Sequence, residues 1–90
     1  MKKLDEDAVI EFPCQFPIKV MGAASNDFDI IVTDIIKKHV SKPSEYTVKS
    51  RLSREGNYIA VTVTIEAKSR EQLDNIYLDL TEHKKVLMAL

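Results

Sequence analysis

This 90-residue sequence has no tryptophan, one cysteine, two glycines and no long run of apolar residues. A single cysteine excludes an intramolecular disulfide framework and any CxxC redox or metal pair within one chain. No segment approaches the roughly 20 apolar residues that a membrane-spanning helix requires. The opening MKKLDEDAVIEF places three acids where a signal peptide has its apolar stretch. We therefore expect a cytoplasmic protein without a membrane segment.

The charges of the chain are nearly balanced. Thirteen Lys and Arg against fourteen Asp and Glu give a formal net charge of -1. Such a chain has no global positive field to attract nucleic acid or anionic lipid, so nucleic acid is disfavoured as a partner unless a local basic patch exists. The 44% hydrophobic and 30% charged residues are typical of a globular chain. Ninety residues suffice for one domain with one modest core.

The first half of the chain predicts a strand followed by a helix. Residues 16–21 alternate, with Phe16, Ile18 and Val20 on one face and the remaining residues on the other, as in a half-buried strand, and Gly22 is expected to end this strand. Residues 27–40 carry apolar side chains at the spacing of a helix with one buried stripe. Ser25 or Asn26 is expected to cap its start.

The second half predicts a hairpin followed by another helix. Residues 46–53 alternate, and REGN at 54–57 forms a loop whose glycine can adopt positive φ. The sequence YIAVTVTIEA at 58–67 is the clearest strand pattern and should be central in the sheet. Ser69 and Gln72 have the spacing of a capping box, which predicts the start of the second helix.

A last strand, VLMAL at 86–90, completes the order strand, helix, strand, strand, helix, strand. Two split βαβ units with right-handed crossovers place both helices on one face of a four-stranded antiparallel sheet. We therefore predict a ferredoxin-like α+β sandwich in a single domain of residues 1–90, with residues 1–15 as an N-terminal covering segment. The apolar residues expected to face the helices together are Phe16, Ile18, Val20, Ile59, Val61, Val63 and Ile65.

Residues that could catalyse a reaction or bind a metal are few and scattered. Cys14 lies between Pro13 and Gln15, before the predicted first strand, and we interpret it as a packing residue rather than a nucleophile. His39 and His83 belong to separate elements without HxxH or HExxH spacing, so we expect surface or helix-end histidines. An acylphosphatase-like arginine is absent from the loop after the first strand. We expect no catalytic set, metal or cofactor, and hence no enzyme.

The glycine loop between the first strand and the first helix is the candidate ligand site. Small residues at a helix N-terminus expose backbone N–H groups that can receive a carboxylate, although a tight turn explains the glycine equally well. One exposed helix end contributes only about 0.3 to 1 kcal/mol per charge, whereas millimolar binding requires about 4 kcal/mol. A second surface, such as another subunit, must therefore complete the site. The candidate ligand-binding residues are Gly22, Ala23, Ala24, Ser25 and Asn26.

The C-terminal strand has no charged side chain, although it lies at an edge of the predicted sheet. An uncharged edge can pair with a partner strand, which predicts a homodimer or a protein partner. Alternatively, AVIEF at 8–12 folds back over this edge. The candidate interface residues are Val86, Leu87, Met88, Ala89 and Leu90.

The open face of the predicted sheet suggests RNA binding as an alternative function. RNA-recognition motifs stack bases on aromatic side chains of the central strands. Here Ala60, Thr62 and Thr64 occupy those positions, which together with the absence of net positive charge weakens this interpretation. The residues that would bind RNA are Lys19, Lys49, Arg51 and Tyr58.

Three segments, EFPCQFPIKVMG, GNYIAVTVTIEA and the terminal KVLMAL, resemble the YbeD-like family of small bacterial proteins of unknown function. The resemblance covers nearly the whole chain. It implies a ferredoxin-like domain similar to ACT domains, the small-molecule-sensing modules of amino-acid metabolism, and a link to lipoate metabolism. An ACT ligand commonly sits by the glycine loop at a subunit interface, which corresponds to residues 22–26. Unlike regulated enzymes with ACT domains, these 90 residues include no catalytic domain.

The residues and the resemblance together predict a non-enzymatic regulatory or interaction domain. Its expected ligand is a small carboxylic or amino acid, and its expected partner is a second copy or another protein. A weak RNA-binding module that uses the open sheet face is the alternative.

Overall fold

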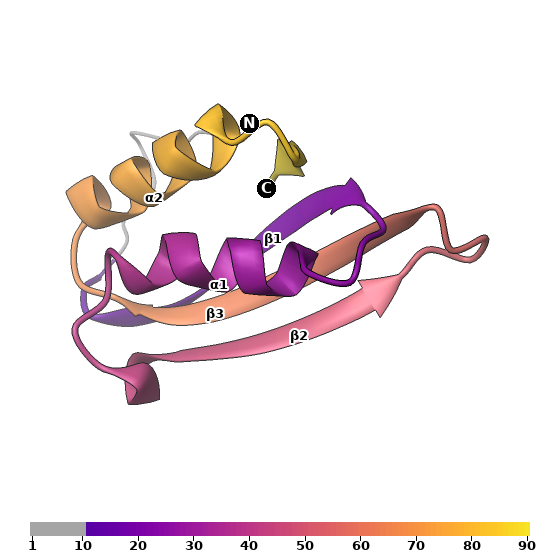
Figure 1. The fold of residues 1–90 in the computed structure, drawn as a ribbon. Helices are drawn as coiled ribbons and strands as arrows, with labels where there is room; N and C mark the ends of the chain where they lie inside the picture. Colours follow the sequence, from indigo (N-terminus) through magenta and orange to yellow (C-terminus); the bar gives the residue numbers. More distant parts are fainter. Residues whose placement is uncertain (1–10) are drawn as a thin grey trace.

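The computed structural model describes residues 11–90, which form a four-stranded sheet with two α-helices on one face (Figure 1). The strand order is β2-β3-β1-β4, and every neighbouring pair is antiparallel. This topology confirms the predicted ferredoxin-like sandwich. The elements are β1 (Cys14–Ala23), α1 (Phe28–Lys37), the short 3₁₀ helix η1 (Pro43–Glu45), β2 (Tyr46–Leu52), β3 (Tyr58–Ala67), α2 (Arg70–Glu82) and β4 (Val86–Ala89).

The two central strands and the two helices form the core between them. β1 and β3 pair along their whole lengths, from Cys14 opposite Ala67 to Ala23 opposite Tyr58, so their inward side chains form matched rows. Phe16 is partly buried, and the other six residues predicted to face the helices are buried. The large side chains that are fully buried are Ile18, Val20, Phe28, Val32, Ile36, Val61, Val63, Ile65, Leu73, Ile76 and Leu80.

β1 begins earlier than its alternating pattern predicted. Cys14 and Gln15 belong to the strand, so the expected covering segment cannot extend to residue 15. The partly buried Cys14 packs against the core, in agreement with its interpretation as a packing residue. Most of the expected covering segment, including residues 8–10 of AVIEF, lies outside the described residues.

The prediction that Gly22 ends the first strand is wrong, because Gly22 lies inside β1. A Cβ atom at this position would lie 2.4 Å from Cε1 of Phe28 and 2.7 Å from the carbonyl oxygen of Lys85. The glycine is therefore required by the close approach of α1 and of the turn before β4. As a result, the loop that connects β1 to α1 begins only at Ala24.

The two helices begin differently. The N-cap of α1 is Asp27, whose side chain makes no capping hydrogen bond, so the prediction that Ser25 or Asn26 caps this helix is wrong. At the start of α2 the predicted cap by Ser69 is confirmed, because its hydroxyl accepts a 3.1 Å hydrogen bond from the backbone N–H of Gln72. The second bond of the predicted capping box differs, since the Gln72 side chain accepts from the N–H of Lys68 rather than from that of Ser69. Neither described helix is long and apolar enough to cross a bilayer.

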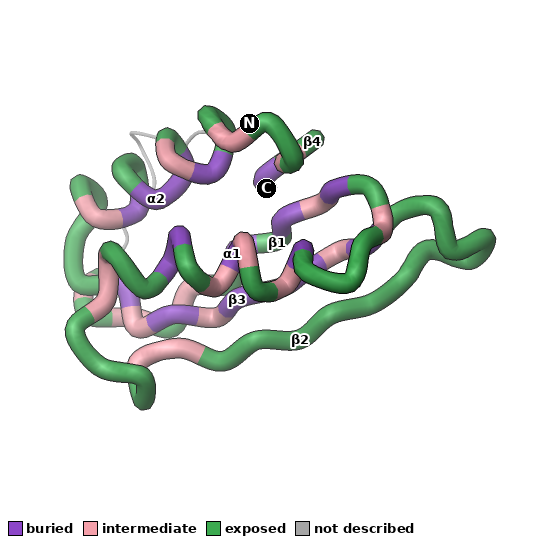
Figure 2. The backbone as a smooth tube through the Cα atoms, viewed as in Figure 1, coloured by how far each residue is buried: buried purple, intermediate pink, exposed green. Residues whose placement is uncertain are grey.

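The helices cover the sheet unevenly. Val48 and Leu52 point to the helix side of β2, yet they remain 37% and 58% exposed. Figure 2 shows β2 exposed along most of its length, whereas β1 and β3 alternate between buried and less buried residues. Within residues 11–90, no helix covers the opposite face of the sheet, which is therefore open (Figure 1).

Candidate functional site

The open face of the sheet carries basic side chains in two neighbouring rows. Lys19 of β1 and Lys49 of β2 are both register partners of Thr62, so they flank the central strand. In the next row, Arg51 is the partner of Ala60. Register partners point to the same side of a sheet, and strands lie about 4.8 Å apart. These rows therefore place three cations around two small central side chains.

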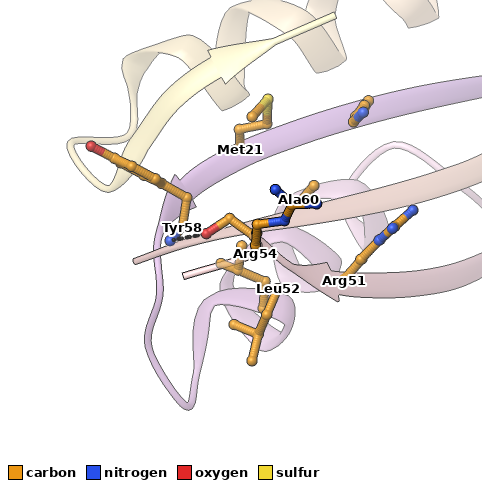
Figure 3. Close-up of a pocket in the computed structure, with 9 residues that line it drawn as sticks. Met21, Arg51, Leu52, Arg54, Tyr58 and Ala60 are labelled. Carbon is orange, nitrogen blue, oxygen red and sulfur yellow. Dashed lines mark hydrogen bonds between the residues drawn. The ribbon is translucent and has the colours of Figure 1, made fainter. Parts of the chain in front are cut away.

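Two adjoining hollows of about 470 and 360 Å³ lie on this face, the smaller of which is shown in Figure 3. Lys19 and Arg51 border both hollows. Lys49 borders the larger one, and Arg54 of the hairpin loop borders the smaller one. None of the described residues that line them is acidic. We call the surface formed by these four cations the basic face.

Tyr58, the one ring of the predicted RNA site, also lines the smaller hollow. Its side chain is 52% exposed, and Figure 3 shows it projecting away from Arg51 and Arg54. Its backbone N–H donates a 3.0 Å hydrogen bond to the hydroxyl of Ser53, which fixes the end of the hairpin. The structure thus brings the four residues of the RNA alternative onto one face without placing the ring above the cations.

The basic face borders an apolar strip toward β4, formed by Met21, Met88 and Leu90. Met88 is the register partner of Met21. Leu90 exchanges backbone hydrogen bonds of 2.8 and 3.1 Å with Lys19, which extends the pairing beyond the last strand residue. Met88 and Leu90 are 47% and 43% exposed. The two surfaces therefore meet on β1.

The residues of the predicted β4 interface divide between the core and the surface. Ala89 is buried, and Val86 packs against the core. Leu87 is 62% exposed, at the irregularity where the β1–β4 register shifts. Together with Met88 and Leu90, it leaves an exposed apolar edge at the side of the sheet opposite β2.

The glycine-loop site predicted from the sequence has fewer open donors than expected. The backbone N–H of Ala24 donates a 3.0 Å hydrogen bond to the carbonyl oxygen of Asn57. The Ser25 hydroxyl donates to Oδ1 of Asp27 at 3.0 Å, which places a carboxylate at the start of α1. That carboxylate repels an incoming anion. Neither hollow on the open face includes a residue from Gly22 to Asn26.

The histidines have structural partners rather than a shared site. Nε2 of His39 lies 2.6 Å from Oδ2 of Asp79, which links the end of α1 to α2. Nδ1 of His83 accepts a 3.1 Å hydrogen bond from the backbone N–H of Lys85. In the part of the chain that the structure describes, no group of three or more His, Cys, Asp or Glu could hold a metal ion.

Sequence reasoning missed Arg54 and the apolar strip. Arg54 lies in the predicted hairpin loop, three positions after Arg51, and its approach to β3 depends on the path of that loop. The alternation of the first strand predicts that Met21 faces outward, but its neighbour on β4 depends on a register that the sequence pattern does not specify. The alternation of side chains along β4 could have indicated which of its residues face outward, but the bulge at Leu87 interrupts that alternation.

Comparison with known proteins gives a family match over most of the chain. A family described as "Protein of unknown function (DUF493)" matches residues 7–90. A UPF0250 protein of Chromobacterium violaceum is 43% identical over 86 residues, which cover 96% of this chain and 97% of the relative. One from Neisseria meningitidis serogroup C is 42% identical over 86 residues, with 96% and 94% coverage. One from Janthinobacterium sp. is 43% identical over 91 residues and covers both chains fully.

The fold is similar to the solution structure of protein HP0495 from Helicobacter pylori. That structure has a TM-score of 0.76 at 13% identity and covers 100% of this chain and 94% of its own. A second solution structure of HP0495 gives a TM-score of 0.59 at 12% identity, with 94% and 98% coverage. These likenesses show the fold alone. The sequence matches confirm the YbeD-like resemblance, and the chain belongs to the DUF493 (UPF0250) family of uncharacterised bacterial proteins.

Proposed function

We propose that this chain is a non-enzymatic binding module that holds an anionic partner on its basic face. The observation that carries the proposal is the convergence of Lys19, Lys49, Arg51 and Arg54 around two hollows lined by no described acid. An exposed ion pair contributes at most about 1 kcal/mol. Four such pairs reach the roughly 4 kcal/mol of millimolar binding only if each contributes this maximum, so further contacts are needed.

The ACT resemblance implies a more specific version of this proposal. In it, the anionic partner is a small carboxylic or amino acid and the chain is a regulatory domain that senses it. A single carboxylate can contact two of the cations on the basic face, where Lys49 and Arg51 lie two residues apart on one side of β2. The glycine loop supports such a ligand less well, because Asp27 lies at its end. The regulatory role, the cytoplasmic location and the link to lipoate metabolism rest on the sequence interpretation.

A homodimer through β4 is our proposal for the exposed edge of the sheet. Among residues 11–90, β4 is the outermost strand on this side of the sheet and its exposed Leu87 is uncharged, a combination that favours strand pairing. Sedimentation at increasing protein concentration tests it. The wild-type chain should associate and Leu87→Lys should remain monomeric, whereas a wild-type monomer at all concentrations would rule the dimer out.

RNA binding remains the second candidate, because Lys19, Lys49, Arg51 and Tyr58 do lie on one face. The residues that line the hollows favour RNA less than an anionic partner that has no nucleobases. Only one ring lines the hollows, and Figure 3 shows it pointing away from the arginines. Single-stranded nucleic acid is normally held by stacking on several rings as well as by charge.

Binding measured by fluorescence anisotropy at low and at physiological ionic strength tests the proposal. The probes are a labelled glutamate homopeptide and a single-stranded RNA of equal charge. We expect salt-sensitive binding of the peptide that falls about tenfold or more in Lys49→Glu/Arg51→Glu. The control Lys37→Glu/Lys84→Glu, which makes the same change in net charge away from the basic face, should bind as the wild type does.

The outcomes separate the candidates. If neither probe binds at low ionic strength, the basic face is not an anion site and the proposal falls. If the RNA binds more tightly than the peptide and the charge-reversal variant loses that binding, the second candidate replaces it. If the control variant loses as much affinity as the Lys49 and Arg51 variant, the attraction is a general charge effect and the proposed site is wrong.

A further inference from the structure

The open face changes in chemical character from one edge of the sheet to the other. Along the row through Arg51, the side chains on successive strands are Arg51, Ala60, Met21 and Met88. Along the neighbouring row they are Lys49, Thr62, Lys19 and Leu90. The face therefore has basic side chains on β2, small side chains on β3 and apolar side chains on β4. β1 contributes the basic Lys19 and the apolar Met21.

A short protein segment is long enough to contact both edges. The distance from β2 to β4 is three strand spacings, or about 14 Å. An extended chain advances about 3.3 Å per residue, so about four residues cross the face. A segment that crosses the strands can place carboxylates beside Lys49 and Arg51 and apolar side chains against Met88 and Leu90.

Nucleic acid matches only half of this surface. Its phosphates would pair with the cations, but they would leave the exposed Met88 and Leu90 without an apolar partner. Its bases would find Ala60 and Thr62 where a stacking surface requires rings. An acidic segment with apolar side chains complements both the charge and the apolar area.

The helix side offers an acidic segment no comparable cluster of cations. The two helices contain six acids and two cations, Lys37 and Arg70, while Lys38, Lys84 and Lys85 follow directly on their C-terminal ends. Charges of both signs are therefore mixed there, whereas no described acid lines the hollows of the basic face, which attracts an acidic segment more strongly. The acids on the helices are Asp29, Asp34, Glu71, Asp74, Asp79 and Glu82.

We infer that the basic face and the apolar strip together bind an acidic segment of another protein that also carries large apolar side chains. The carboxylates lie beside Lys49 and Arg51, and the apolar side chains cover Met88 and Leu90. This inference rests on the proposed function and goes further by naming the partner as an amphipathic acidic polypeptide.

Selection from a displayed library of random peptides tests the inference without a preselected sequence. We expect the enriched peptides to combine acidic with large apolar residues. The affinity of one enriched peptide is then measured for three variants. It should fall about tenfold in Lys49→Glu/Arg51→Glu, and about tenfold in Met88→Ser/Leu90→Ser, which removes apolar contact area. It should be unchanged in the control Ile30→Ser/Leu78→Ser, whose wild-type residues are 57% and 53% exposed on the helices.

The results distinguish this inference from the function on which it rests. If the glutamate homopeptide binds the basic face but Met88→Ser/Leu90→Ser binds the enriched peptide as the wild type does, the inference falls and the anion-binding function stands. If no peptide is enriched and the homopeptide does not bind, both fall. Enriched peptides without acids, or an RNA probe that binds more tightly than the enriched peptide, would also overturn the inference.

Discussion

Gly22 lies on β1 where the ring of Phe28 and the carbonyl oxygen of Lys85 come close to the backbone. Gly22→Ala would place a Cβ atom 2.4 Å from the ring and 2.7 Å from that oxygen, so the ring and the backbone must both shift. Overpacking of a core in this way costs about 1 to 3 kcal/mol. Urea denaturation should show a decrease of this size in the free energy of unfolding.

Two further variants test this explanation of the glycine. Phe28→Leu removes the ring, so it should be less destabilising in the Gly22→Ala background than in the wild type. Ala23→Ser changes the next, exposed residue and should leave stability nearly unchanged. A Gly22→Ala variant as stable as the wild type would show that the glycine is not required for packing.

Tyr77 predicts a loss of stability at high pH. It is 5% exposed, and burial raises the pKa of its phenol above the ordinary value of 10.0. The unfolded chain therefore releases this proton first, so the contribution to stability is complete below about pH 10 and is lost as the pH rises through the higher folded value. The difference in unfolding free energy between the wild type and Tyr77→Phe should be constant near neutral pH and change against the wild type above about pH 10. Parallel profiles of the two proteins would contradict this account.

Among the elements, α1 and α2 are joined at one end by Gln72. Its Nε2 donates a 2.7 Å hydrogen bond to the carbonyl oxygen of His39, and its Oε1 accepts one of 2.7 Å from the backbone N–H of Lys68. The first turn of α2 thus contains a residue that also satisfies a carbonyl group just beyond the end of α1. The pair of His39 and Asp79 reinforces the same junction.

Substitution of Gln72 separates its two hydrogen bonds. Gln72→Ala removes both and should lower the free energy of unfolding by about 1 to 3 kcal/mol. Gln72→Glu keeps an acceptor for the N–H of Lys68 but places an oxygen against the carbonyl oxygen of His39, so it should also lower the free energy of unfolding. Asn75→Ala, at an exposed position on the same helix, is the control. Equal stability of Gln72→Ala and the control, measured by thermal unfolding, would contradict the proposed junction.

The elements that the sequence predicted best are those whose periodicity is continuous. β3 alternates over ten residues, and its predicted and observed faces agree because a period of two leaves one arrangement with a buried apolar side. The role of Gly22 was not predictable, since it depends on Phe28 and Lys85, which approach only after folding. The basic face could not be predicted without the register of the strands. Lys19 and Lys49 are thirty positions apart in the chain, and they come together only because both are register partners of Thr62.

Across the whole molecule, a net charge of -1 conceals a local cluster of cations. Four cations gather around the hollows of the open sheet face, whereas charges of both signs are mixed on and beside the helices. The overall charge disfavours nucleic acid unless a local basic patch exists, and the folded arrangement creates such a patch. The patch arises because β2 and the hairpin carry Lys49, Arg51 and Arg54 in a short interval.

A titration followed by amide chemical shifts tests most directly the claim that the open sheet face is the binding surface. The labelled chain is titrated with the glutamate homopeptide at low ionic strength. We predict that the largest shifts fall on Lys19, Lys49, Arg51 and Thr62, and that they disappear as salt is added. Shifts centred on residues 24–27 or on the helices, or no shifts at all, would contradict the account.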